Sequence, residues 1–521
     1  MSEVLLAGLI AVGIIVLTPV SDRIRLPLPV VLTVFGLVLA FVFQGQPLQV
    51  NPDLILPIVL PPLLFAATQR ATFREYRDEA ASILILAVGL TVASCVAVAV
   101  VAHALGVGWG PAFVLGAVVS PPDPVAATAV ARRLRLPSRL VTILEGEGMF
   151  NDATALVLYG VAITAVLNGQ LSSAGIAVNM VLALVVGVGV GLVAGWATRV
   201  ALGALHEATT ETTVTVVMPF AVYLVADEFG GSGVLAVLTL GLYLRSFAHP
   251  SLTSAGWLLG RAVWRFADYL ITSVVFVLIG FELTAVLENV DVTATLVRDS
   301  AAVIGLLIVL RLAWMFGATA LARFFGWAMG GDRPHGSRET FIVGWSGMRG
   351  VVTVAAALAI PLTVDSGQAF PDRDELVVVA LTCVLVTLVM QGLTLAPLVR
   401  ALGVGRGDED GAGIHELRER AARAGLDAVR ARVQDGTYPE SVVRAATLQY
   451  EGYLAAQEAF ASARDEIGGA ADENRLADLL REASEAERDV VLDARRRGMV
   501  SPAVADEVLE DVESRSVRDV D

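Results

Sequence analysis

The chain has 521 residues, of which 55% are hydrophobic and 17% charged, and its mean hydropathy is +0.70. An average soluble protein is about 25% charged, so this composition argues against a soluble enzyme. The formal net charge of -15 is concentrated after residue 400, because residues 401–521 hold 16 arginines and 27 acidic residues. We therefore predict an apolar membrane body over residues 1–400 and an acidic tail over residues 401–521. Such a tail is unsuited to nucleic-acid binding.

Apolar runs follow one another through the body. A bilayer is crossed by roughly 20 apolar residues in a helix, and the backbone inside a bilayer is satisfied only in helices or closed barrels. Continuous runs favour helices, so we predict an all-α polytopic membrane protein with about 13 transmembrane helices. The predicted spans are residues 4–20, 28–43, 53–67, 80–105, 111–131, 140–167, 175–202, 213–229, 233–247, 266–288, 300–325, 339–364 and 376–399.

Arginines gather in alternate loops of this arrangement. One set of loops holds clusters such as Arg132, Arg133 and Arg139, whereas the other set holds Arg298 and Arg373. Positively charged short loops stay in the cytoplasm, so we expect the N-terminus outside, the tail in the cytoplasm and the body in the plasma membrane. The first run has no small-residue cleavage site after it, which favours a span over a signal peptide.

The tail and the cysteines predict accessory features. Cys95 and Cys383 lie far apart inside apolar runs, so we expect packing residues, with no disulfide and no cofactor. A glycine-punctuated linker, residues 403–413, precedes apolar residues at helical spacing, among them Leu479 and Val490. These features predict soluble helices that serve dimer contacts or stability, with a regulatory sensor as the alternative.

One apolar span is interrupted by prolines and an acidic residue. Residues 120–124 have the sequence Ser-Pro-Pro-Asp-Pro, and prolines lack the N–H that a continuing helix needs. The span must therefore break near its middle, at Asp123. Broken helices in transporters present free backbone groups to a substrate near the membrane midplane.

The next span carries several polar groups. Glu145, Glu147, Asn151 and Asp152 occur within eight residues, and the spacing of Glu147 and Asn151 places them on one helix face. A charged side chain deep in a span costs at least about 2.5 to 3.5 kcal/mol and marks a pathway or a buried pair. A purely structural polar seam is a poor explanation for three carboxylates.

A second interrupted span lies far downstream. Residues 344–350 contain three glycines and leave Arg349 within an apolar span, where it needs a partner. The fifth and twelfth predicted spans cross the membrane in opposite directions and are both broken near the centre, which is the pattern of an inverted repeat. Two broken helices that cross, with carboxylates between them, predict a cation site whose access can alternate.

Other charged residues in the body have simpler interpretations. We expect Arg311 to face Glu282 in a structural or gating pair, since both interrupt apolar runs. Asp268, Asp227 and Glu228 fall near predicted span ends, where water can solvate them.

An intramembrane serine protease and a cation channel are the two alternatives to a carrier. Residues 344–347, Gly-Trp-Ser-Gly, match a motif of intramembrane serine proteases, but such an enzyme needs a buried histidine, and no histidine falls in the middle of a predicted span. We therefore predict that the protein is not an enzyme. A cation channel stays as an alternative, although a single asymmetric acid cluster between inverted halves favours a carrier.

In these residues the chain resembles the monovalent cation:proton antiporter family that includes bacterial NhaP-type and animal sodium/proton exchangers. The resemblance covers residues 1–400. It rests on Asp123-Pro124-Val125-Ala126, on Glu147 with Asn151-Asp152, on residues 347–350 and 355–361, and on the stretches 231–237 and 278–280.

The resemblance implies a homodimer in which some helices form a scaffold and a six-helix core carries the ion. It implies that Asp152 is the carboxylate for the cation and the proton, with Asn151 beside it and Asp123 at the crossing. It further implies that Glu147 pairs with Arg349, and that asparagine before Asp152 marks electroneutral exchange.

Three positions depart from the family pattern. Many relatives have threonine, serine and an acidic residue where this chain has Pro122, Gly148 and Ala66. Because these side-chain ligands are missing, backbone carbonyls or water must complete the coordination of the cation. Sodium or lithium is the expected ion, and potassium is the alternative.

The expected mechanism is competition at one carboxylate. Burial disfavours the charged form of a carboxyl group, so Asp152 can hold either a proton or a cation. A bare carboxylate that crosses the hydrocarbon is costly, so the core moves only when Asp152 holds a proton or a cation. Each movement therefore carries one of the two ions, and the result is exchange.

Overall fold

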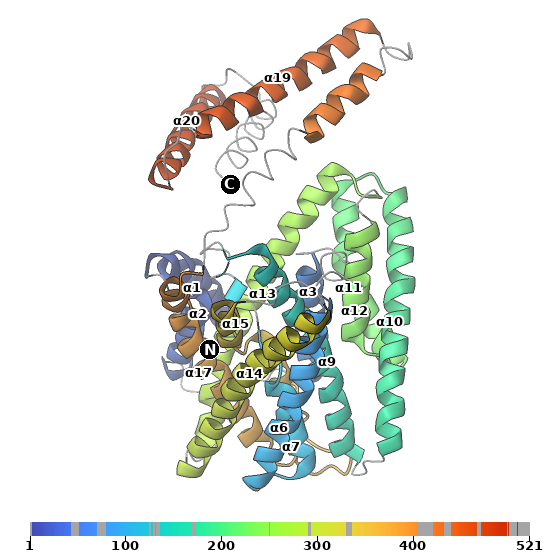
Figure 1. Ribbon diagram of the computed structural model, residues 1–521, viewed down its shortest axis with the longest axis vertical. Coiled ribbons are helices and arrows are strands. Elements are labelled where there is room, and N and C mark those ends of the chain that lie inside the picture. Colours follow the sequence, from blue (N-terminus) through green and yellow to red (C-terminus); the bar gives the residue numbers. More distant parts are fainter. Residues whose placement is uncertain are drawn as a thin grey trace. The chain divides into compact units, whose positions relative to one another are not determined.

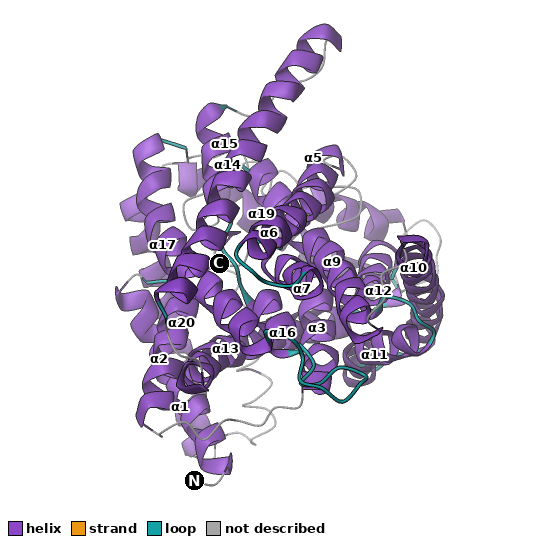
Figure 2. Ribbon diagram, turned by 90° about the horizontal axis from the view of Figure 1, so that it is seen from below, coloured by secondary structure: helices purple, strands orange, loops and turns teal. Residues whose placement is uncertain are grey.

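The fold of this chain is helical. The computed structural model describes residues 3–24, 26–42, 52–69, 80–123, 127–128, 131, 136–168, 173–248, 251–289, 293–329, 336–404, 420–431, 439–465, 470–497, 499 and 508. Every element longer than an isolated bridge within these residues is a helix, as Figure 2 shows. The chain divides into two compact units, Met1–Arg406 and Gly407–Asp521.

Helices occupy each of the apolar runs predicted in the first unit. Their bounds are α1 Glu3–Ile24, α2 Leu28–Val42, α3 Pro52–Thr68, α5 Ala80–Leu84, the π-helical η1 Ile85–Leu90, α6 Thr91–Ala104, α7 Trp109–Val119, α9 Ser138–Asn168, α10 Ser173–Ala204, α11 Ala208–Glu228, α12 Gly233–Phe247, α13 Ser254–Asn289, α14 Ala294–Met329, α15 Ser337–Trp345, α16 Val351–Leu358 and α17 Arg373–Leu402. Figure 1 shows their arrangement.

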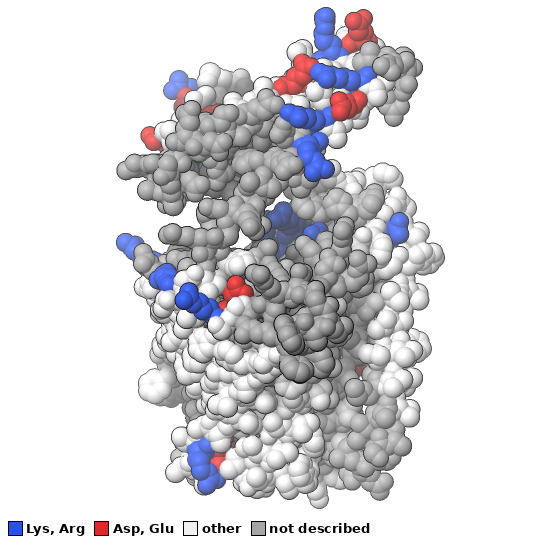
Figure 3. All heavy atoms as spheres, viewed as in Figure 1, with Lys and Arg blue, Asp and Glu red and all other residues white. Residues whose placement is uncertain are grey.

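Seven helical stretches among the described residues are long and apolar enough to cross a membrane. They are Ala80–Ala104, Leu140–Leu167, Val181–Ala204, Ala208–Glu228, Ser254–Phe281, Ala294–Leu321 and Arg373–Leu402, and five shorter apolar helices accompany them. The outer side chains of α10 are apolar, with Val178 64% and Val193 68% exposed. Lipid solvates such a surface and water does not. In Figure 3 the first unit accordingly presents a broad uncharged surface, with most of its visible charged side chains toward the two ends.

The ends of α17 show how local sequence sets the helix bounds. Asp374 and Glu375 lie in its first turn and Arg400 in its last turn, where each charge complements the helix dipole. The helix ends at Leu402 and is capped by Gly403, whose φ of 65° lies in the left-handed region that glycine adopts at helix ends.

The helices of the first unit form two sets. Helices α1, α2, α3, α10, α11, α12 and α13 pack mainly with one another, and we call them the scaffold helices. In Figure 1, α10, α11 and α12 stand together at one side. The second set, which we call the crossing bundle, comprises α5, η1, α6, α7, α9 and α14 to α17.

Both predicted interruptions occur in the structure. Helix α7 ends at Val119, and residues 120–123 continue without helical structure. Helices α15 and α16 are separated by residues 346–350, which are not helical. The prolines and glycines of these two segments thus interrupt the spans as their backbone chemistry requires.

Two helices differ from the sequence expectation. Helix α13 begins at Ser254, 12 residues before the predicted start at residue 266, so Asp268 lies well inside a helix and not at a span end. The polar side chains of its early turns had masked the start of the apolar run. Residues 85–90 form a π-helical turn where a regular helix was expected; such turns are rare and occur often at functional sites.

The second unit is helical as well. Its helices are residues 420–431, α19 Glu440–Asp465 and α20 Ala470–Arg496. Leu426 and Val443 are buried in this unit, and Arg430 forms a 2.8 Å ion pair with Glu451. Both ion-pair partners are about half exposed, so packing rather than this pair holds the helices together.

Candidate functional site

The two interrupted spans meet at Asp123. The backbone N–H of Asp123 donates a hydrogen bond of 2.6 Å to the carbonyl of Met348, which links one interruption to the other. The Asp123 carboxylate accepts a hydrogen bond of 3.2 Å from the N–H of Val351, the first residue of α16. A helix N-terminus carries a partial positive charge, so the Asp123 carboxylate satisfies the first N–H of α16 and complements the charge at this buried helix start.

Gly350 makes this approach possible. A Cβ atom at residue 350 would lie 1.5 Å from Oδ2 of Asp123, a distance that no real structure tolerates. Any other residue must therefore move the Asp123 carboxylate away from the helix start. The glycine in the predicted interruption thus has a steric reason as well as a conformational one.

Arg349 makes the reciprocal contact at the other broken helix. Its Nε donates a 3.0 Å hydrogen bond to the carbonyl of Val119, the last residue of α7, and a terminal nitrogen donates to the carbonyl of Gly347. Its backbone N–H donates to the hydroxyl of Thr387. A cation is stabilised at a helix C-terminus, so each interruption supplies the charge that the opposite broken helix needs.

Asn151 of α9 fixes the first interruption from the side. Its Nδ2 donates a 2.9 Å hydrogen bond to the carbonyl of Pro122, and the side chain is fully buried. Its Oδ1 is buried and has no hydrogen-bond partner among the described residues. An unpartnered buried oxygen is costly, and here it is free to contact a cation or water.

Asp152 follows Asn151 and lies partly buried on the same helix. Its carboxylate forms no hydrogen bond or ion pair with any residue that the structure describes, whereas Asp123 acts on it electrostatically. The described residues also hold no group of three or more histidine, cysteine or acidic side chains able to bind a metal ion. The oxygens present here are those of the Asp123 and Asp152 carboxylates and of the Asn151 amide.

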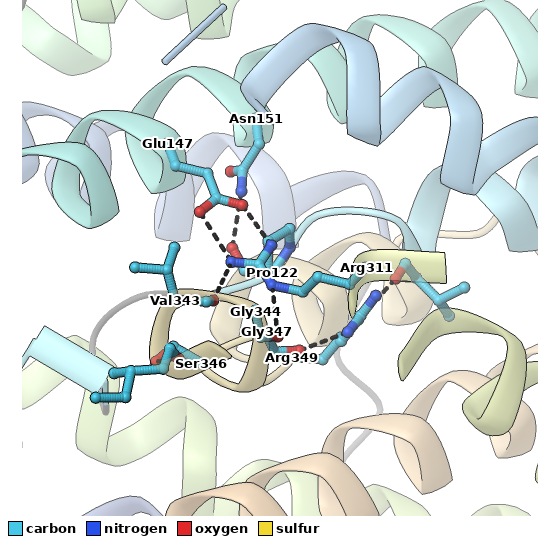
Figure 4. Close-up of polar contacts among 11 residues, drawn as sticks. Pro122, Glu147, Asn151, Arg311, Val343, Gly344, Ser346, Gly347 and Arg349 are labelled. Atoms are coloured by element: carbon cyan, nitrogen blue, oxygen red, sulfur yellow. Dashed lines mark hydrogen bonds and ion pairs between the residues drawn. The ribbon is translucent and has the colours of Figure 1, made fainter. Parts of the chain in front are cut away.

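The structure corrects the partner of Glu147. Its carboxylate is bound by both terminal nitrogens of Arg311, with 2.9 Å between Arg311 Nη2 and Glu147 Oε2. Arg349, the partner that the family resemblance implied, instead contacts backbone carbonyls. Figure 4 shows Glu147 and Arg311 pointing toward one another and Arg349 turned away to its carbonyl partners.

The expected Arg311–Glu282 pair is corrected by the same contacts. Arg311 lies on α14 and also donates to the carbonyls of Gly344 (3.2 Å) and Val343 (3.1 Å) at the end of α15. A Cβ at Gly347 would lie 2.3 Å from Cδ of Arg311, so the missing side chain lets the arginine pass between α15 and α9. The side chain of Glu282 lies outside the described residues.

Sequence reasoning missed the role of Arg311 because the family resemblance had already given Glu147 to Arg349, which left Glu282 as the expected partner of Arg311. The glycines at positions 344 and 347 were the available signal, since small residues permit a close approach by a long side chain.

The structure does not support the serine-protease alternative. The hydroxyl of Ser346 donates a 2.7 Å hydrogen bond to the Ile342 carbonyl of its own helix.

A polytopic helical body whose two interrupted helices meet at a pair of acidic residues, Asp123 and Asp152, is the architecture of a secondary ion transporter. The family model described as "Sodium/hydrogen exchanger, transmembrane" matches residues 9–401. The chain belongs to the sodium/hydrogen exchanger family, which confirms the predicted resemblance. This is a family of transporters and not of enzymes.

Individual relatives agree with this assignment. An uncharacterized Na⁺/H⁺ exchanger of Mycobacterium tuberculosis is 33% identical over 436 residues, covering 82% of this chain and 79% of that protein. The sodium, potassium, lithium and rubidium/H⁺ antiporter of Bacillus subtilis is 29% identical, covering 75% of this chain and 61% of that protein. Cation/proton antiport is thus the general activity of the family.

A solved structure has the same fold. The sodium proton antiporter MjNhaP1 from Methanocaldococcus jannaschii superposes with a TM-score of 0.58 at 18% sequence identity, covering 77% of this chain and 99% of that chain. At this identity the likeness concerns the fold. The described part of our chain therefore shares the helical antiporter architecture.

Proposed function

We propose that this protein exchanges Na⁺ or Li⁺ for H⁺ across the plasma membrane by alternating access, one cation for one proton, in pH and sodium homeostasis. The observation that carries the proposal is the Asp152 carboxylate, which has no hydrogen-bond or ion-pair partner among the described residues, beside Asp123 and Asn151 at the meeting point of the two interrupted helices. All three oxygen-bearing side chains serve as ion ligands in this proposal, with Asp152 taking the cation or the proton.

The charges around the crossing support an electroneutral cycle. Three carboxylates lie there, on Asp123, Glu147 and Asp152, together with two guanidinium groups, on Arg311 and Arg349. One net negative charge is left. A single monovalent cation or a single proton neutralises it, and the core then moves through the hydrocarbon without the cost of a bare charge.

Ion selectivity is the open choice within this proposal. Pro122, Gly148 and Ala66 offer no side-chain ligand, so carbonyls such as that of Pro122 and water complete the shell. A loose shell of this kind discriminates weakly between ion sizes. The Bacillus subtilis relative is named for sodium, potassium, lithium and rubidium, which makes K⁺/H⁺ exchange the second candidate.

The arrangement in the membrane is part of the proposal. We infer about 13 spans, of which the broken fifth and twelfth are related as an inverted repeat. The arginine pattern favours an external N-terminus and a cytoplasmic tail. The scaffold helices, which pack mainly with one another, are the proposed dimer contact, and the crossing bundle is the mobile part.

The test is an exchange assay in inside-out vesicles from cells that lack their own antiporters. Adding Na⁺ or Li⁺ should dissipate an imposed pH gradient, and the rate should be unaffected by an imposed membrane potential. Parallel additions of K⁺ across a range of pH measure selectivity. Absence of a response to every cation would reject the antiporter proposal, and a rate that follows the potential would reject one-for-one exchange.

A further inference from the structure

A cavity of about 670 Å³ opens in the first unit, and its described lining residues do not include Asp123, Asn151 or Arg349 of the crossing. Most of its wall belongs to the scaffold helices α3, α11, α12 and α13. Glu145 of the crossing bundle and Thr128, between α7 and α9, contribute to the remaining wall. The cavity is therefore bounded by both sets of helices.

Three arginines line this cavity. Arg245 lies in the last turn of α12, and Arg261 and Arg265 lie one turn apart on α13. Like charges four residues apart on a helix destabilise it. The cavity thus brings three guanidinium groups from two helices to one place, where three acidic residues, Glu145, Glu211 and Asp268, also line the wall.

None of these arginines forms an ion pair with a residue that the structure describes. Arg261 lies over the ring of Trp257, with 5.4 Å between its Cζ and the ring centroid. Stacking of this kind leaves the edge of the guanidinium group free to donate hydrogen bonds. The Nε of Arg245 is buried and has no hydrogen-bond partner among the residues that the structure describes. Unpaired guanidinium groups with free N–H donors favour phosphate or carboxylate ligands.

The same cavity also has unused acceptors. Glu211 is fully buried, and its Oε2 accepts hydrogen bonds from the Thr253 N–H (3.1 Å) and hydroxyl (3.0 Å). Its Oε1 and the hydroxyl of Thr212 are buried and have no hydrogen-bond partner in the described part of the chain. Glu145 and Asp268 line the cavity too, and each has interactions of its own. A neutral hydroxyl group on a ligand would suit Glu211 and Thr212 without adding charge.

We propose that this cavity binds a phosphate-bearing polyol, with the phosphate held by Arg245, Arg261 and Arg265 and a ligand hydroxyl held by Glu211 and Thr212. The headgroup of an anionic glycerophospholipid and a soluble polyol phosphate share this chemistry. A ligand there touches both sets of helices. If the crossing bundle moves as proposed above, the bound ligand slows exchange.

Binding is measured on the purified full-length protein in a neutral detergent, as a shift of its melting temperature. The probes are glycerol 3-phosphate, dihexanoyl phosphatidylglycerol, inorganic phosphate and dihexanoyl phosphatidylcholine, each at matched ionic strength. We expect saturable stabilisation by at least one of the first two and weaker effects of the last two. Stabilisation by glycerol 3-phosphate identifies a soluble ligand, and stabilisation by phosphatidylglycerol alone identifies a lipid headgroup.

Variants locate the site. Arg245→Gln and the double variant Arg261→Gln, Arg265→Gln should weaken binding at least about tenfold, because each removes a charged hydrogen-bond donor. Arg199→Gln is the matched control, since Arg199 is exposed on α10 outside the cavity. If Arg245→Gln lowers the melting temperature without ligand, Arg245→Lys retains the charge and should still lose affinity because it lacks the planar fork.

Several outcomes overturn the proposal. Absence of stabilisation by both polyol phosphates rejects the site, and unchanged binding in the arginine variants rejects its location. Inorganic phosphate binding as tightly as glycerol 3-phosphate rejects the role of Glu211 and Thr212. The melting measurement needs no transport, so its result is separate from the outcome of the exchange assay.

Discussion

Arg311 and Glu147 form a bidentate ion pair in which each side chain is only 3% exposed. The pair joins α14 to α9, while two carbonyls at the end of α15 accept the remaining hydrogen bonds of the arginine. Arg349 is then free to hold the end of α7. Two buried arginines thus have separate tasks, one tying helices together and one capping a broken helix.

Breaking the Arg311–Glu147 pair should destabilise the protein. Arg311→Met leaves an uncompensated carboxylate, which costs about 3 to 5 kcal/mol in a buried pair, and the melting temperature of the purified protein should fall accordingly. Adding Glu147→Leu to that variant should restore most of the loss, because two apolar side chains replace the whole pair.

The same change in Glu147 should not rescue Arg349→Ala. Arg349 binds carbonyls of Val119 and Gly347, so its loss exposes the end of α7 whatever residue 147 is. Equal rescue of both arginine variants, measured by the same melting experiment, would show that the two arginines share Glu147.

Gly350→Ala should abolish exchange. The added Cβ would lie 1.5 Å from Asp123 Oδ2, so the carboxylate must leave the start of α16. The control is Gly305→Ala on α14, where a Cβ meets nothing within 4 Å and alanine should be neutral or stabilise by up to about 1 kcal/mol. Exchange rates in vesicles, normalised to the amount of protein, measure both. Normal exchange by Gly350→Ala would contradict the capping role of Asp123.

Asp123→Asn should separate folding from transport. Asparagine is also a good acceptor at a helix start, so the melting temperature should change little, by the equivalent of about 1 kcal/mol or less. The substitution removes the one net negative charge at the crossing, so the affinity for the cation should fall strongly. Cation dependence of the exchange rate measures this, and an unaltered dependence would remove Asp123 from the ion site.

Much of the fold could be predicted from local chemistry. The apolar runs place helices such as α6 and α17 because a bilayer leaves the backbone no other choice. The prolines at 121 and 122 and the glycines at 347 and 350 predict the interruptions, since they act on their own backbone. The grouping of Asn151 and Asp152 with Asp123 came from the family resemblance, because helical spacing relates only residues of the same helix.

The pairing of charges could not be predicted in the same way. Glu147 has two buried arginines as possible partners, and the choice depends on how α14 packs against α15. The sequence indicates only that Gly344 and Gly347 leave room. The early start of α13 was missed for a related reason, because Arg261, Arg265 and Asp268 line a cavity and interrupt the apolar run.

The most direct test of the account compares Asp152→Asn with Asp299→Asn in inside-out vesicles. Asp299 lies on α14 beside the exposed Arg298, so the control makes the same chemical change outside the crossing. Addition of Na⁺ should collapse the imposed pH gradient with the control and leave it unchanged with Asp152→Asn, at equal amounts of folded protein. Full exchange by Asp152→Asn would contradict the assignment of this carboxylate as the group that carries both ions.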